Sequence, residues 1–202
     1  RSGLFIRLAK KYHKPFIYVN QIGGNDELVF DGRSFAVNEA GQPVLLLNAF
    51  VEQIQVLDTE NIGPSAKWPK SDPAGDVYQA LVLGLRDYLK KTGFQKAVLG
   101  LSGGIDSALV AAIAAEALGP KNVLGISMPS PYSSKGSVDD SRKLAENLGI
   151  GFKVIPISRL YQKYLASLKS TFKGTRSGLA EENIQARIRG NILMAYSNKF
   201  GH

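Results

Sequence analysis

The sequence AVLGLSGGIDSAL at residues 97–109 predicts a short apolar strand, then a loop of small residues, then an alanine-rich helix. A strand–loop–helix of this kind directs several unpaired backbone N–H groups and the positive end of the helix dipole at one point. Gly103 and Gly104 let the chain turn sharply and approach an anion closely, because neither residue carries a Cβ atom. A phosphate is therefore the ligand that this stretch predicts.

Polar side chains of the same loop favour a nucleotide pyrophosphate. Ser102 and Ser107 supply hydroxyl donors, and Asp106 supplies a carboxylate that could hold Mg²⁺ against the phosphates. The alternative is a glycine-rich turn that merely connects a strand to a helix.

Three motifs compete for these residues. A Walker P-loop needs a lysine where Asp106 stands, and the glycine pattern of a dinucleotide-binding G-x-G-x-x-G is missing at Leu101 and Ser102. Residues 100–104 do satisfy the G-x-S-x-G nucleophile elbow of serine hydrolases. A hydrolase triad would also need an acid and a histidine downstream, and the only histidine there is His202. The hydrolase interpretation therefore lacks a general base.

The string SGGIDS at residues 102–107 resembles the SGG-x-D-S loop of the PP-loop ATP pyrophosphatases. This resemblance implies cleavage of ATP between the α and β phosphates, with adenylation of an oxygen that a nitrogen or sulfur nucleophile then displaces. It also implies that Asp106 is a ligand of Mg²⁺, which would neutralise the charge of the departing pyrophosphate. The ATP-binding residues that the resemblance implies are Gly100, Leu101, Ser102, Gly103, Gly104, Ile105, Asp106 and Ser107.

A second motif is the sequence EENIQARIRGNILM at residues 181–194. Isoleucines recur at every fourth position and predict one buried face of a helix, and a separate polar stripe recurs with the same spacing. The polar stripe consists of Asn183, Arg187 and Asn191. An asparagine and an arginine on one face could bind a carboxylate, a ribose or a phosphate, and an ordinary solvated face explains the spacing equally well.

This motif resembles the E-N-x-Q-A-R-x-R-G helix of the NAD synthetases, which belong to the PP-loop group. The resemblance implies ATP-dependent amidation of deamido-NAD to NAD through an adenylated intermediate, with release of AMP and pyrophosphate. It makes Asn183 and Arg187 candidate contacts of deamido-NAD, whereas Arg189 points elsewhere and is expected to be structural. NAD synthetases are typically dimers or larger, so we expect a homo-oligomer.

Residues 15–34, PFIYVNQIGGNDELVFDGRS, are similar to the closing part of a nitrilase-type glutaminase domain. In glutamine-dependent NAD synthetases that domain precedes the synthetase domain and supplies ammonia from glutamine with a cysteine nucleophile. This sequence contains no cysteine, so no glutaminase nucleophile is assigned. The resemblance covers residues 4–58 and 76–202 and predicts an internal piece of such an enzyme. We expect a nitrilase-like part at 1–58, a linker at 59–75, and a synthetase domain at 76–202 that stops before its C-terminal end.

The strand and helix signals predict the architecture around these motifs. In the second half they alternate, which predicts an α/β fold with a doubly wound parallel sheet and ligands at the carboxyl ends of its strands. The first half predicts the C-terminal part of a nitrilase-like α+β sandwich, and a helix follows from Pro73 towards Gly93. The predicted strands are 16–20, 27–30, 34–38, 44–47, 52–57, 97–101, 123–127 and 152–156, and the other predicted helices are 1–14, 107–118, 138–148 and the motif helix.

Composition excludes several classes of function. No segment is apolar enough for a membrane span, and two histidines without a cysteine do not suggest a zinc site. The net charge is +8, but the basic residues are scattered rather than clustered with aromatic side chains, so no nucleic-acid partner is expected. The cytoplasm is the default compartment for such a chain.

Two rival interpretations stay open. Another PP-loop enzyme would share the ATP loop, although the motif at 182–190 argues against a GMP synthetase and the absence of cysteine argues against a tRNA-thiolation enzyme. The second rival is a nucleotide-binding piece without activity, because we expect residues 1–202 alone to be weakly active or inactive.

Overall fold

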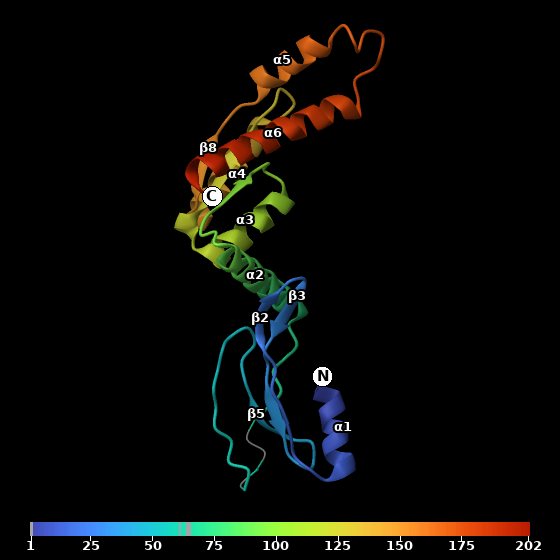
Figure 1. Ribbon diagram of the computed structural model, residues 1–202, viewed down its shortest axis with the longest axis vertical. Coiled ribbons are helices and arrows are strands. Elements are labelled where there is room, and N and C mark those ends of the chain that lie inside the picture. Colours follow the sequence, from blue (N-terminus) through green and yellow to red (C-terminus); the bar gives the residue numbers. More distant parts are fainter. Residues whose placement is uncertain (1, 61, 64–65) are drawn as a thin grey trace. The chain divides into compact units, whose positions relative to one another are not determined.

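The computed structural model describes residues 2–60, 62–63 and 66–202 of the chain. The chain forms two compact units, Arg1–Tyr88 and Leu89–His202, called the N-terminal and the C-terminal unit below (Figure 1). The predicted linker at 59–75 lies partly outside the described residues, at 61 and 64–65, and its described part carries no helix or strand before Pro73. The domain boundaries at 58 and 75 stay predictions.

In the N-terminal unit, a helix packs on an antiparallel sheet. Helix α1, Ser2–Tyr12, places Phe5 and Ala9 against Phe35 and Val37 of the sheet, which has the order β1-β4-β5. Strands β2 and β3 form a separate antiparallel hairpin. The strands are β1 Phe16–Tyr18, β2 Ile22–Asn25, β3 Leu28–Asp31, β4 Phe35–Val37 and β5 Pro43–Leu46.

The prediction of a strand at 52–57 is wrong. Ile54 and Val56 are 102% and 92% exposed, and no described strand lies beside this segment to accept its backbone hydrogen bonds. Alternation of apolar and polar residues makes a strand only where a neighbouring strand and a core receive the two faces.

The prediction misses β2 because glycines at 23 and 24 are poor strand formers. They serve a close approach to helix α2, Pro73–Thr92. The N–H of Gly24 donates to Asp87 Oδ2 at 2.7 Å, and a Cβ atom at Gly23 would lie 3.0 Å from the same oxygen. The start of α2 is as predicted, since Asp72 Oδ1 accepts the N–H of Gly75 at 3.0 Å.

In the C-terminal unit, a parallel sheet of order β6-β7-β8 alternates with helices, which confirms the predicted α/β fold. Helix α3 connects β6 to β7, and helix α4 connects β7 to β8. Because crossover connections are right-handed, these two helices cover one face of the sheet. The elements are β6 Ala97–Gly100, α3 Ile105–Leu118, a short 3₁₀ helix Pro120–Asn122, β7 Val123–Ser127, α4 Lys135–Leu148, β8 Gly151–Val154, α5 Ser158–Leu168 and α6 Leu179–Phe200.

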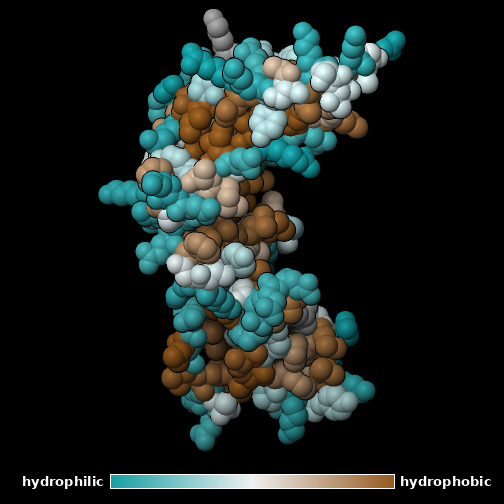
Figure 2. Space-filling view, turned by 45° about the horizontal axis from the view of Figure 1, so that its top comes forward, coloured by the Kyte–Doolittle hydropathy of each residue, from teal (hydrophilic) through white to brown (hydrophobic). Residues whose placement is uncertain are grey.

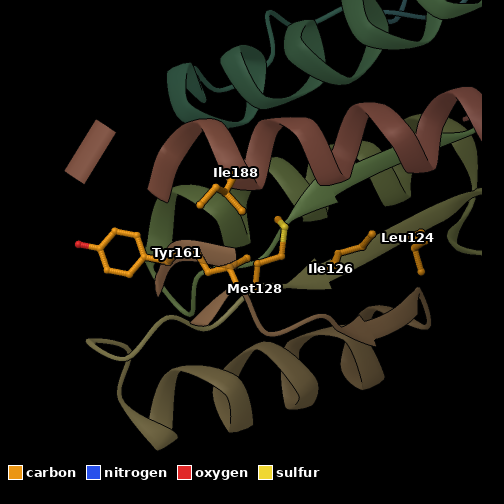
Figure 3. Packing of buried hydrophobic residues seen from close by; sticks show 6 residues of the cluster. Leu124, Ile126, Met128, Tyr161 and Ile188 are labelled. Carbon is orange, nitrogen blue, oxygen red and sulfur yellow. The ribbon is translucent and has the colours of Figure 1, made fainter. Parts of the chain in front are cut away.

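Helices α5 and α6 cover the other face and complete the doubly wound arrangement. Leu124 and Ile126 of β7 pack with Met128, Tyr161 of α5 and Ile188 of α6 in one apolar cluster (Figure 3). Ile184 and Ile192 pack against the same cluster, as the fourfold spacing of isoleucines predicts. Helix α5 is not predicted from the sequence, although this helix contains the buried residue Tyr161.

Apolar side chains are also exposed on the surface of the protein (Figure 2). The exposed apolar residues include Val19 of the N-terminal unit and Ile105 and Leu179 of the C-terminal unit. Within the described ranges, no helix combines the length and the apolar character needed to cross a membrane.

The core of the C-terminal unit gives the first testable prediction. Ile126 is fully buried between the two helical layers, so Ile126→Ala should lower the free energy of unfolding by about 2–5 kcal/mol. Leu179→Ala is the control, because Leu179 is 76% exposed and its loss should cost no more than about 0.5 kcal/mol. Urea denaturation followed by circular dichroism measures both. Equal effects of the two variants would contradict the described core.

Candidate functional site

The loop between β6 and α3 lies at the carboxyl end of the parallel strands, where ligands bind in open α/β sheets. It begins at Leu101, whose side chain is buried and whose N–H donates to Ile126 O at 2.9 Å. The residues after Leu101 are exposed, and α3 starts at Ile105. The structure thus brings the predicted residues 100–107 together at one edge of the sheet.

Two serine hydroxyls fix the shape of the loop. Ser102 Oγ accepts the N–H of Gly104 at 3.2 Å and lies 3.1 Å from Ser107 Oγ. Ser107 Oγ accepts the N–H of Ser102 at 3.3 Å and donates to Gly104 O at 2.9 Å. The two hydroxyls predicted as ligand donors therefore bind backbone of the loop itself.

Gly103 is the residue that lets the loop pack against α4. Its φ of +81° lies in the left-handed region, and a Cβ atom there would lie 2.7 Å from Ser137 O and 2.8 Å from Ser137 Cα. Ser137 belongs to the first turn of α4, where its N–H donates to the capping Ser134 Oγ at 3.1 Å. A side chain at position 103 would thus separate the loop from the start of α4.

The first turn of α3 offers backbone donors. The N-cap of α3 is Gly104, which has no side chain to accept them. The structure shows no hydrogen bond from the N–H of Ile105, Asp106 or Ser107 to any described residue. The first hydrogen bond of the helix is donated by Ala108, to Gly104 O at 3.2 Å. Three neighbouring N–H groups at the positive end of a helix are suited to a phosphate.

Asp106 is the acidic residue of this turn, and its side chain is exposed. In the described part of the chain there is no group of three or more His, Cys, Asp or Glu residues that could hold a metal ion together. A single carboxylate beside donors for phosphate nevertheless fits Mg²⁺, which proteins commonly bind through one or two carboxylates, water and the phosphates of a substrate.

The second motif forms α6, and its two predicted ligand residues share an exposed face. Asn183 and Arg187 are one helical turn apart and both side chains are exposed. Neither side chain is hydrogen-bonded to the loop at 100–107 among the described residues, so no direct contact joins the two candidate sites.

Two other side chains of α6, those of Arg189 and Glu181, make hydrogen bonds that hold the helix in place. Arg189 Nε donates to Met128 O at 3.2 Å, so Arg189 does point away from Arg187, as predicted. At the start of the helix, Glu181 Oε2 accepts the N–H of Gly178 at 2.7 Å. This hydrogen bond lowers the pKa of Glu181, because it stabilises the charged carboxylate.

Two side-chain arrangements in the segments that follow β7 were not predicted. Ser134 caps the start of α4 by accepting the N–H of Ser137, and the spacing of a serine cap with a second serine three residues later could have shown the helix start. Tyr132 follows β7 and its ring lies 6.2 Å from that of Tyr161. Burial raises the pKa of Tyr161, and Tyr132 adds to the shift. Nothing in the sequence pairs these two tyrosines.

A doubly wound sheet with a donor-lined turn at its carboxyl edge defines the class: an α/β protein whose strand–loop–helix turn has the geometry of a phosphate site. Within that class, the NAD synthase family model matches residues 77–202. The chain belongs to the NAD synthase family.

Three similar proteins illustrate the relationship. A glutamine-dependent NAD(+) synthetase of Synechocystis is 53% identical over all of this chain, which covers 37% of that protein. The structure of a glutamine-dependent NAD+ synthetase from Acinetobacter baumannii in complex with ADP is 38% identical, with a TM-score of 0.94 over 100% of this chain and 39% of that one. An NMN synthetase from Francisella tularensis is 31% identical, with a TM-score of 0.58 over 64% of this chain and 52% of that one. The chain thus spans well under half the length of its glutamine-dependent relatives.

Substitution of Gly103 tests the contact between the loop and α4. Gly103→Ala should lower the free energy of unfolding by about 1–3 kcal/mol more than Gly119→Ala, because overpacking is added to backbone strain. Gly119 is the matched control, since its φ is +83° and a Cβ atom there would meet nothing closer than 4.0 Å. Urea denaturation of the two variants gives the difference. If both lose the same stability, Ser137 does not confine the loop.

Proposed function

We propose that this chain carries the nucleotide-binding part of an enzyme that amidates deamido-NAD to NAD at the expense of ATP, with ammonia obtained from glutamine in the longer protein. The observation that carries the proposal is the set of unengaged N–H groups at Ile105, Asp106 and Ser107, in a chain of the NAD synthase family. The names of the relatives support the substrates, and the ADP complex of the Acinetobacter protein supports the nucleotide.

The proposed chemistry has two steps. The nicotinate carboxylate of deamido-NAD attacks the α-phosphorus of ATP, so that a carboxylate–phosphorus bond forms and the bond between the α-phosphorus and the bridging oxygen breaks. Pyrophosphate leaves with the electron pair. Ammonia then adds to the activated carbonyl carbon, AMP departs, and the nitrogen loses a proton to give the amide of NAD.

The loop at 100–107 is proposed to bind the pyrophosphate group of ATP. Its donors are already oriented by the Ser102 and Ser107 hydroxyls, so little reorganisation is needed as charge moves onto the leaving group. Asp106 would hold Mg²⁺, which supplies further neutralisation of phosphate charge when bound. Positioning and charge stabilisation carry the rate, since no side chain has to form a covalent bond.

Asn183 and Arg187 are proposed to bind deamido-NAD. A guanidinium and an amide on one exposed face suit the phosphates, ribose and carboxylate of a dinucleotide. With no cysteine in the chain, the thiol for glutamine hydrolysis is assigned to sequence outside residues 1–202. We propose that the reaction takes place in the cytoplasm and that the longer protein is a homo-oligomer.

The test of the function is pyrophosphate release from ATP and Mg²⁺ in the presence of ammonium, with the chain and with a longer protein of the relatives' length. Release by the longer protein should require deamido-NAD. Arg187→Gln should raise the KM for deamido-NAD by about tenfold or more, the cost of losing a charged hydrogen bond, and leave the KM for ATP unchanged. Arg176→Gln, at an exposed arginine before α6, is the control.

Three outcomes speak against parts of this proposal. Release that requires nicotinate mononucleotide instead would assign the chain the substrate class of the NMN synthetase. Release that requires XMP would assign another PP-loop reaction. Equal effects of Arg187→Gln and Arg176→Gln would remove Arg187 from the dinucleotide site.

Substitution of Asp106 tests the metal assignment. Asp106→Asn should weaken ATP binding by about tenfold or more in the presence of Mg²⁺, because a neutral amide replaces the carboxylate that faces the ion. Binding of ATP in EDTA should not weaken, since the backbone donors remain. Asp139→Asn on α4 provides the control for removing one exposed negative charge. An equal loss with and without Mg²⁺ would show that Asp106 is not a metal ligand.

A further inference from the structure

The end of β7 presents a row of carbonyl groups, each with a partner. Ser127 O accepts the N–H of Ile155 at 2.8 Å, and Pro129 O accepts the N–H of Ile157 at 2.9 Å, both towards the chain that follows β8. Towards β6, Ile126 O accepts the N–H of Leu101 at 2.9 Å. The next carbonyl on the β6 side is Met128 O, and its partner is the guanidinium of Arg189.

Arg189 occupies a place that a backbone donor would otherwise take. In the parallel register Gly100 lies beside Ile126, so the donor two residues after Leu101 would be the N–H of Gly103. The chain has left the sheet by then, because it turns at Ser102 and Gly103 to form the phosphate loop. The carbonyl that this turn leaves without a ladder partner is satisfied by Nε of Arg189, at 3.2 Å.

The same contact fixes α6 against the site. One turn after Arg189, Leu193 lies over the end of β6, where a Cβ atom at Gly100 would be 3.7 Å from Leu193 Cδ1. Met128 Cε approaches the same position to 3.3 Å. Arg189 therefore stands where three elements meet: the end of β7, the departing β6 and the helix that carries Asn183 and Arg187.

We propose that Arg189 is a positioning residue that sets the distance between the dinucleotide face of α6 and the pyrophosphate loop. This inference rests on the proposed function. Arg189 touches neither substrate; it acts through Met128 O, so that the carboxylate held by α6 meets the α-phosphorus of ATP held by the loop.

A purely structural role is distinguishable from this one. Ile184, Ile188 and Ile192 already attach α6 to the sheet by apolar packing. Apolar packing is not directional and tolerates small shifts, whereas a hydrogen bond from a guanidinium to one carbonyl has a preferred distance and angle and so restrains the position of the helix. Loss of Arg189 should therefore leave α6 attached and misplace it slightly. A misplacement of about 1 Å is enough to slow a reaction about a hundredfold.

The experiment compares Arg189→Met and Arg189→Lys with the unmodified longer protein, measuring deamido-NAD-dependent pyrophosphate release and the thermal midpoint. We expect Arg189→Met to lower kcat about a hundredfold, with the KM values for ATP and deamido-NAD within about threefold. Arg189→Lys keeps a charged donor and should recover at least about a tenth of the lost kcat. Arg159→Met, at an exposed arginine of α5, is the control and should match the unmodified protein.

The possible outcomes distinguish a failure of the positioning role of Arg189 from a failure of the proposed function. An unmodified protein that releases pyrophosphate while Arg189→Met retains its kcat overturns the positioning role alone. A rise of both KM values in proportion to the loss of kcat would show a merely structural contact and would also overturn the positioning role. The same conclusion would follow if the thermal midpoint fell together with the rate in both Arg189→Met and Arg189→Lys. An unmodified protein that never depends on deamido-NAD overturns the proposed function, and the role of Arg189 falls with it.

Discussion

The hydrogen bond from the N–H of Leu101 to Ile126 O is the last one that joins β6 to β7, and the site depends on where it falls. Up to this point the two strands share a regular parallel ladder. Beyond it, the chain turns away, and α3 starts after only a few residues. The backbone donors of the first turn of α3 are left at the carboxyl edge of the sheet because the ladder stops there. If the ladder were two residues longer, residues of the loop would be part of the strand instead.

The end of the ladder requires a left-handed turn and leaves one carbonyl without a ladder partner, and other parts of the C-terminal unit meet both requirements. A left-handed turn is needed, which Gly103 supplies, and α4 packs closely enough against that glycine to exclude any side chain. The loop is then tied to itself through Ser102 and Ser107. On the neighbouring strand, the carbonyl of Met128 loses its ladder partner and takes a side chain from α6 instead. The shape of the loop and its contacts with α4 and α6 thus all depend on where the ladder between β6 and β7 ends.

The sequence was most informative where a pattern is local. The turn at 102–107, the helix start at Pro73 and the isoleucine spacing of α6 each depend on residues within a few positions of one another, and the structure agrees with all three. The contact of Gly103 with Ser137 and that of Arg189 with Met128 join segments far apart in the chain, and no local pattern encodes them. The strand predicted at 52–57 failed for the same reason, since its formation depends on a neighbour that the pattern does not specify. Asn183 and Arg187 lie on one face as expected, but a shared face does not show what binds there.

Titration of the ¹⁵N-labelled chain with inorganic pyrophosphate tests the central claim, that the turn after β6 binds phosphate through its backbone. The amide signals of Ile105, Asp106 and Ser107 should move first and furthest, because these N–H groups have no acceptor among the described residues. The amides of the basic segment at 169–176 should stay in place. Shifts confined to that basic segment, with the three α3 amides unchanged, would contradict the account.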